Sequence, residues 1–136
     1  MTSAKIQWIG GQRFVGTDSG NHSVVLSTRD EGVGMKPSEL LLVALGSCTA
    51  VDVVDIMVKK RQTLVSLNIE VTGEQEADPP WTFTRIHVKY IASGKNIIEK
   101  DLAQAIALSE EKYCCVAATV SGKAKVITSY EIVTSE

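Results

Sequence analysis

The stretch from Pro37 to Arg61, PSELLLVALGSCTAVDVVDIMVKKR, constrains the fold most because it predicts one long helix. Pro37 suits a first helical turn, where its missing N–H would have no partner anyway. Glu39 lies near the positive end of the helix dipole, and a basic run lies near the negative end. The first half has no polar face, because apolar residues are almost continuous from Leu40 to Leu45. We therefore expect this half to be buried on all sides.

The composition limits the class of protein. A chain of 136 residues with 44% apolar and 22% charged residues fits a single globular domain, 1–136. The formal net charge is −2 and the basic residues are scattered, which argues against a nucleic acid partner. The first residues alternate between apolar and polar side chains, as in a strand, and lack the basic and then apolar stretches of a signal peptide. The apolar run from Leu40 to Leu45 is far shorter than the ~20 residues of a membrane span. We expect a soluble, cytoplasmic protein with no membrane partner.

Strands are predicted before and after the long helix. Alternating residues between Gly-rich and Asx-rich turns predict three short strands at 4–9, 13–16 and 23–28. After the helix, 65–71 alternates clearly, and 86–90 forms a second strand antiparallel to it.

The remaining segments complete an α+β pattern. An amphipathic helix is predicted at 97–113, a short helix at CCVAATV and a final strand at 123–133. This order indicates helices gathered on one side of an antiparallel sheet. A first helix that is apolar all round has more surface than one sheet can cover, so we expect a homodimer.

Cys48, in the middle of the long helix, allows two interpretations. Free cysteine is among the most buried residue types, so Cys48 can simply fill space in the core. Its small neighbours, Gly46 and Ser47 among them, instead permit close approach by a helix or a substrate. A thiol reacts as the thiolate, which burial beside Asp52 disfavours, so activation would need an outside cation. The candidates are Arg13, Arg29 and Arg85.

Cys114 and Cys115 form a vicinal pair at the end of the second predicted helix. Adjacent side chains on a helical turn diverge by about 100°, so only one of them can face Cys48. Three thiols suffice for a two-cysteine cycle, in which a thiolate attacks a peroxide, becomes a sulfenic acid and is resolved as a disulfide. The pair can equally be a coincidence, with one side chain packed and the other exposed.

Other chemistry has weaker support. His22 is predicted in a turn and His87 on the polar face of a strand, so both are expected to be solvated. A Cys-His hydrolase or a metal site is therefore disfavoured, and no C-x-x-C motif suggests zinc. We expect no metal and no cofactor.

Two segments together carry a family resemblance. KPSELLLVALGSCTAVDVV, followed by a second helix ending in EKYCCVAATV, resembles the OsmC/Ohr family of osmotically inducible protein C and the organic hydroperoxide resistance proteins. The likeness covers essentially the whole chain and is closer to the less characterised OsmC-like branch. It implies antiparallel sheets with a long central helix, an intertwined homodimer with sites at the subunit interface, and thiol peroxidase activity on organic hydroperoxides.

The resemblance also implies roles for the cysteines. By position, Cys48 matches the peroxidatic cysteine and Cys114, directly after Glu-Lys-Tyr, matches the resolving cysteine. Cys115 then is a bystander.

The polar partners match less closely. In the organic hydroperoxide resistance branch, a glutamate usually follows the proline and holds an arginine over the thiolate. Here Ser38 has that place and Glu39 is the acid that follows it. Arg13 lies in the early strand where the arginine is expected, so Glu39 and Arg13 are the candidate activating residues.

The leading hypothesis is a dimeric, cofactor-free peroxidase in stress defence. Cys48 would attack an organic hydroperoxide, Cys114 would resolve the sulfenic acid, and an external dithiol would regenerate the enzyme. One alternative is a non-enzymatic dimer of the same fold that binds a small apolar ligand at the subunit interface. The other is a structural dimer with a core cysteine.

Overall fold

The computed structural model describes residues 2–134 and forms two compact units, which divide between Leu41 and Leu42. The division falls inside helix α1 (Pro37–Lys59). Each unit is therefore described by itself, and the expectation of one domain over 1–136 stays a prediction.

The first unit contains a three-stranded antiparallel sheet in the order β1 (Ala4–Trp8), β2 (Arg13–Asp18) and β3 (Ser23–Ser27). Gly10 and Gly11 form the first turn with positive φ angles of 104° and 55°, which glycine adopts without a steric penalty. All of β1 is exposed, and among residues 2–41 only Leu26 and Ser27 are buried. By itself this unit has almost no hydrophobic core.

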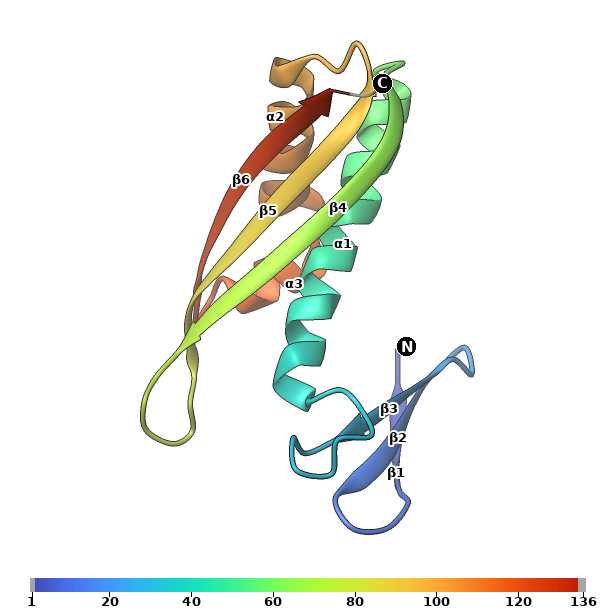
Figure 1. The fold of residues 1–136 in the computed structure, drawn as a ribbon, viewed down its shortest axis with the longest axis vertical. Coiled ribbons are helices and arrows are strands. Elements are labelled where there is room, and N and C mark those ends of the chain that lie inside the picture. Colours follow the sequence, from blue (N-terminus) through green and yellow to red (C-terminus); the bar gives the residue numbers. More distant parts are fainter. Residues whose placement is uncertain (1, 135–136) are drawn as a thin grey trace. The chain divides into compact units, whose positions relative to one another are not determined.

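The second unit contains the rest of α1, a three-stranded sheet and further helices, all on one face of that sheet (Figure 1). The predicted helix at 97–113 is divided, because a turn of π-helix follows its first ten residues. The elements after α1 are β4 (Thr63–Gln75), β5 (Phe83–Lys95), α2 (Glu99–Leu108), the π-helix η1 (Ser109–Tyr113), α3 (Cys115–Val120) and β6 (Lys125–Thr134).

The sheet of the second unit is mixed, which corrects the expectation of antiparallel pairing throughout. Strands β4 and β5 are antiparallel, as predicted. Strand β6, however, pairs parallel with β5, from Arg85 opposite Lys125 to Gly94 opposite Thr134. A parallel neighbour requires a crossover of a dozen or more residues, and α2, η1 and α3 supply that connection.

The core of the second unit lies between its helices and β5. Helix α1 buries one stripe, which recurs at helical spacing from Leu45 through Val53 to Met57. This stripe packs in one cluster with apolar residues of β5 and α2 that are at most 3% exposed: Ile86, Val88, Tyr90, Ala92, Leu102, Ala105 and Ile106.

Another stripe of α1 is apolar but exposed. Val43, Val51, Val54 and Val58 are between 41% and 66% exposed. Leu41, at 39%, and Val43, at 49%, are the exposed large apolar residues in the first half of α1, so the expectation that this half is buried on all sides is wrong for the single chain.

Helix α1 is also long and apolar enough to cross a membrane, by length and composition alone. The run from Leu40 to Leu45 is too short for that, but the helix as a whole has an 18-residue window of mean hydropathy 2.0. The core helix of a soluble protein has the same properties, and α1 packs one stripe into such a core.

Candidate functional site

Helix α1 approaches strand β4 closely at Gly46, two residues before Cys48. A Cβ atom added at Gly46 would lie 2.9 Å from Cγ2 of Val71, so only glycine fits here without a shift of that side chain or the helix. Thr49 is 2% exposed, and its hydroxyl donates to the carbonyl oxygens of Leu45 and Gly46, both at 3.1 Å. This packing holds the part of the helix that carries Cys48, a residue of intermediate exposure.

The π-helix η1 positions Cys114. The backbone N–H of Cys114 donates to the carbonyl oxygen of Ser109 at 2.8 Å, and Cys114 itself is extended, with φ −83° and ψ 107°. It is the N-cap of α3, where its Sγ accepts a hydrogen bond from the N–H of Ala117 at 3.2 Å. A π-helical turn thus precedes Cys114, a residue that is only 2% exposed. Such turns are rare overall but occur often at functional sites.

A buried serine connects η1 to α1 next to the cysteines. Ser109 is fully buried, and its hydroxyl donates to Oδ2 of Asp52 at 2.8 Å. The same hydroxyl lies 3.3 Å from the carbonyl oxygen of Thr49. Sequence reasoning missed Ser109, because a lone serine in a charged helical segment carries no distinctive signal.

The second unit brings Cys48 and Cys114 together. Cys48 packs against the core cluster that contains Cys114, although 66 positions separate the two in the sequence. Burial, followed by the nearby thiol of Cys48, raises the pKa of the Cys114 thiol to about 11. Both cysteines are free, so the pair is in the dithiol state. Cys115 is exposed, consistent with the expectation that only one of the two adjacent cysteines can face Cys48.

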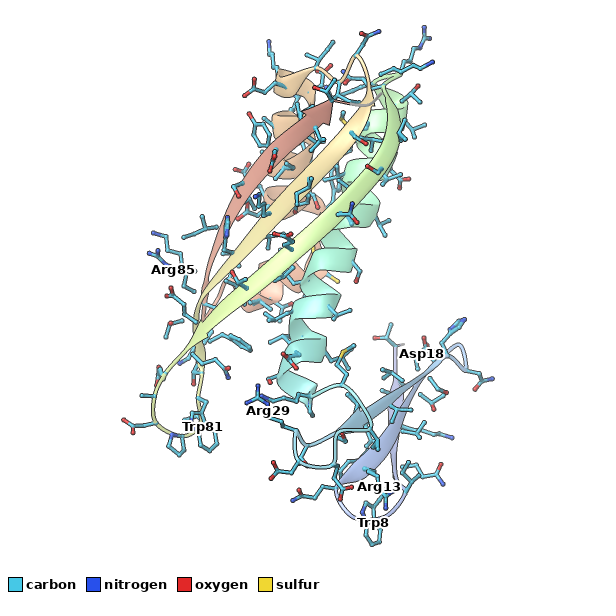
Figure 2. All side chains as sticks on the ribbon, viewed as in Figure 1. Trp8, Arg13, Asp18, Arg29, Trp81 and Arg85 are labelled. Carbon is cyan, nitrogen blue, oxygen red and sulfur yellow. The ribbon has the colours of Figure 1, made fainter. Side chains whose placement is uncertain are left out.

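The other two candidate residues belong to the first unit. Arg13 lies on β2, where its Nε is 3.5 Å from Oε2 of Glu31 and donates to the carbonyl oxygen of Gly10 at 3.3 Å (Figure 2). Glu39 is exposed in the first turn of α1 and has no ion-pair partner among residues 2–134. Their activating roles stay predictions.

The remaining candidate groups lie apart from any constellation. Arg85 is exposed on β5 and points away from the helices (Figure 2). His87 forms a 2.7 Å hydrogen bond with Ser129 and is partly buried rather than solvated. Over the described part of the chain, no three His, Cys, Asp or Glu residues are placed to hold a metal ion.

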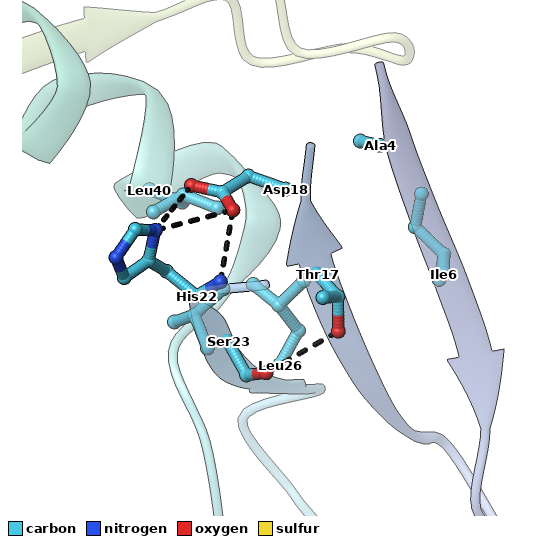
Figure 3. A pocket seen from close by; sticks show the side chains of 10 residues that line it. Ala4, Ile6, Thr17, Asp18, His22, Ser23, Leu26 and Leu40 are labelled. Atoms are coloured by element: carbon cyan, nitrogen blue, oxygen red, sulfur yellow. Dashed lines mark hydrogen bonds and ion pairs between the residues drawn. The ribbon is translucent and has the colours of Figure 1, made fainter. Parts of the chain in front are cut away.

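The first unit has an apolar hollow with a volume of about 360 Å³ (Figure 3). Ile6, Leu26 and Leu40 contribute much of its lining. His22 and Asp18 lie at the hollow and contact each other, with 3.2 Å between Nδ1 and Oδ2. Backbone hydrogen bonding from His22 lowers the pKa of Asp18. This hollow could accept an apolar group, but none of its lining residues is a cysteine.

The burial of Cys114 predicts its rate of alkylation. Raising the pKa of this thiol from 9.0 to about 11 lowers its thiolate fraction at pH 8 roughly 100-fold. We expect iodoacetamide at pH 8 to modify folded Cys114 roughly 100-fold more slowly than the same cysteine in urea, while exposed Cys115 is modified at similar rates in both. Peptide mass spectrometry measures the two sites separately. Equal rates at Cys114 in both conditions would contradict the burial.

Comparison with known proteins gives consistent similarities. A protein-family model described as OsmC-like protein matches residues 29–129. Protein YhfA of Escherichia coli (strain K12) is 33% identical over 130 residues, which cover 96% of this chain and 97% of that protein. A crystal structure of a hypothetical protein from Aquifex aeolicus VF5 is 34% identical, with a TM-score of 0.90 over 100% of this chain and 98% of that one.

A more distant structural likeness extends to an organic hydroperoxide resistance protein OsmC from Legionella pneumophila. Its TM-score is 0.68 over 96% of each chain, and the identity is 17%. At this identity the likeness concerns the fold alone.

Proposed function

Since the chain belongs to the OsmC-like protein family, as its sequence resemblance indicated, we propose that it is a thiol peroxidase that reduces organic hydroperoxides with Cys48 and Cys114. The observation that carries this proposal is the packing of Cys48 against the cluster that contains Cys114, close enough for the Cys48 thiol to raise the pKa of Cys114, because a two-cysteine cycle needs the two sulfurs near each other. The name of the Legionella pneumophila neighbour supports the choice of substrate class.

The proposed reaction balances without a cofactor. The Cys48 thiolate attacks the terminal oxygen of the hydroperoxide, the O–O bond breaks, and the alcohol leaves with a proton. The sulfur of Cys114 then attacks the resulting sulfenic acid, an S–S bond forms, and the S–O oxygen leaves as water. An external dithiol reduces the disulfide by exchange and is itself oxidised. Since these steps require reduced thiols, we place the protein in the cytoplasm.

Arg13 and Glu39 are proposed as the groups that favour the Cys48 thiolate. A cation near the sulfur stabilises the negative form, and a carboxylate can hold that cation in place. Arg13→Gln and Glu39→Gln should therefore each slow the attack of Cys48 on peroxide while leaving the Cys48–Cys114 contact intact.

A homodimer is part of the proposal. The exposed stripe of α1 at Val43, Val51, Val54 and Val58 supports it, because a second copy could cover this apolar surface. The N-terminal sheet, which exposes Trp8 at 66%, adds to the apolar surface that a partner could bury.

The dimer gives a direct test on matched valines. Light scattering should give the wild type a mass twice that of the chain, whereas Val51→Glu should shift the mass toward that of one chain. Val65→Glu is the control, because Val65 on β4 is equally exposed, at 62%, but lies outside the α1 stripe. A monomeric wild type would contradict the dimer.

The cysteine cycle is tested by titrating the reduced protein with cumene hydroperoxide. We expect one equivalent of peroxide to produce a Cys48–Cys114 disulfide, detected by mass spectrometry of non-reduced peptides, while Cys115 stays reduced. If Cys48 stays reduced in excess peroxide, the peroxidase proposal fails. The alternative, a non-enzymatic dimer that binds a small apolar molecule, would then gain support from the hollow at Ile6 and Leu26.

A further inference from the structure

One hydroxyl inside the second unit has no hydrogen-bond partner. Tyr90 on β5 is fully buried, and its hydroxyl oxygen is the buried side-chain N or O atom among residues 2–134 that lacks a partner. Leaving such a group unpaired costs about 1–3 kcal/mol, so buried polar groups in native proteins are normally satisfied. Phenylalanine would fill the same space without this cost. The hydroxyl at this position therefore requires an explanation.

The surroundings of the hydroxyl indicate what that explanation is. Tyr90 belongs to the same core cluster as Cys114, with Cys48 packed against it. The hydroxyl of Thr49 donates to two backbone carbonyl oxygens, and although it lies close enough to lower the pKa of Tyr90, it does not meet the geometry of a hydrogen bond with the Tyr90 hydroxyl. Asp52 already accepts from Ser109. Thr49 and Asp52 thus already have hydrogen-bond partners, whereas the thiol of Cys114, which also lies near the Tyr90 hydroxyl, changes its charge during the proposed cycle.

We propose that Tyr90 is a hydrogen-bond donor to the sulfur of Cys114 when that sulfur becomes the thiolate that resolves Cys48. This inference rests on the proposed peroxidase function and adds a residue to it. In the dithiol state Cys114 keeps its proton and the phenol stays unpaired. When the proton leaves, the phenol O–H and the N–H of Ala117 provide two donors to a buried anion.

The step itself balances with these groups. The Cys114 thiolate attacks the sulfur of Cys48 sulfenic acid, the S–S bond forms and the S–O bond breaks. The departing hydroxide takes up the proton that Cys114 released, so water leaves. Tyr90 keeps its own proton throughout, since burial raises the pKa of its hydroxyl to about 12. It donates a hydrogen bond and is not an acid in the reaction.

Other charged groups face Tyr90 as well. Glu110 on η1 and Asp52 on α1 raise the pKa of its hydroxyl, as does Cys114. Burial and the neighbouring Glu111 raise the pKa of Glu110. Negative charge at either carboxylate disfavours a thiolate nearby, which increases the need for a donor to Cys114.

The test compares Tyr90→Phe with Tyr130→Phe. Tyr130 is the register partner of Tyr90 on β6, and its hydroxyl donates to Glu99 at 2.8 Å. After mixing with cumene hydroperoxide, dimedone trapping measures sulfenic acid at Cys48, and mass spectrometry of quenched samples measures the disulfide. Tyr90→Phe should form the sulfenic acid within twofold of the wild-type rate but form the disulfide at least about tenfold more slowly. Tyr130→Phe should match the wild type in both steps.

A second readout does not depend on peroxide chemistry. The rate of alkylation of Cys114 is measured as a function of pH. The midpoint of its rise should lie at a higher pH in Tyr90→Phe than in the wild type, because the variant lacks a donor to the thiolate. The thermal midpoint of Tyr90→Phe should equal or exceed that of the wild type, since the variant loses only an unpaired hydroxyl.

The outcomes separate the two proposals. If Cys48 of the wild type forms no sulfenic acid, the peroxidase function fails, and the alkylation profile still tests the role of Tyr90. The inference is overturned if Tyr90→Phe forms the disulfide at the wild-type rate and its Cys114 is alkylated with the wild-type pH dependence. The hydroxyl then does not stabilise the thiolate.

Discussion

Cys48→Ser is expected to lose reduction of cumene hydroperoxide by on the order of 10³-fold or more, because the substitution removes the nucleophile of the proposed cycle. A serine hydroxyl is not ionised near neutral pH and cannot carry the oxygen as a sulfenic acid. Peroxide consumption in the presence of a dithiol such as dithiothreitol measures the loss. The fold should be unaffected, since serine is close to cysteine in size and Cys48 is only partly buried.

The other two cysteines provide matched controls. Cys115→Ser should keep wild-type activity, because Cys115 is exposed and lies outside the pair. Cys114→Ser should react once with peroxide and then accumulate sulfenic or sulfinic acid at Cys48, since no thiol resolves the intermediate. Full activity in Cys48→Ser, or an equal loss in Cys115→Ser, would show that the reactive sulfur was wrongly assigned.

Ile86→Ala is expected to lower the free energy of unfolding by about 2–5 kcal/mol, the usual cost of removing a large aliphatic side chain from a packed core. Ile86 is fully buried on β5, where it packs in the cluster formed with α1 and α2. Urea denaturation followed by circular dichroism measures the change, at a fixed protein concentration so that any dimerisation contributes equally.

Ile98→Ala is the control for this substitution, because it makes the same chemical change at a side chain that is 55% exposed. Its effect should stay below about 1 kcal/mol. Similar losses in the two variants would mean that β5 does not contribute the centre of the core.

Much of the second unit could be predicted from local patterns. The alternation of Ile86, Val88 and Tyr90 correctly indicated an inward face, and the long helix predicted from Pro37 to Arg61 is observed from Pro37 to Lys59. The parallel direction of β6 was missed because alternation gives the face of a strand but not its partner or direction. Those depend on the path of the crossover, which is a property of the whole chain.

The candidate site was less accessible to sequence reasoning. The identity of Cys48 and Cys114 came from the family resemblance, whereas their contact depends on the π-helix η1. Five residues are too few for hydrophobic periodicity to separate a π-helix from an α-helix. The unpaired hydroxyl of Tyr90 could not be foreseen either, since a buried tyrosine usually finds a partner and only the surrounding groups decide whether it does.

The parallel pairing of β6 has a consequence for the order of assembly. Cys114 lies in the crossover between β5 and β6, and this segment is held at both ends only after the C-terminal strand has paired. Parallel strands joined by long connections pair late in folding, because the entropy of closing the loop must be overcome first. We therefore expect the two thiols to meet at the end of folding. A nascent or partly unfolded chain would present them separately, so peroxide-driven formation of the Cys48–Cys114 disulfide would report that the second unit is completely folded.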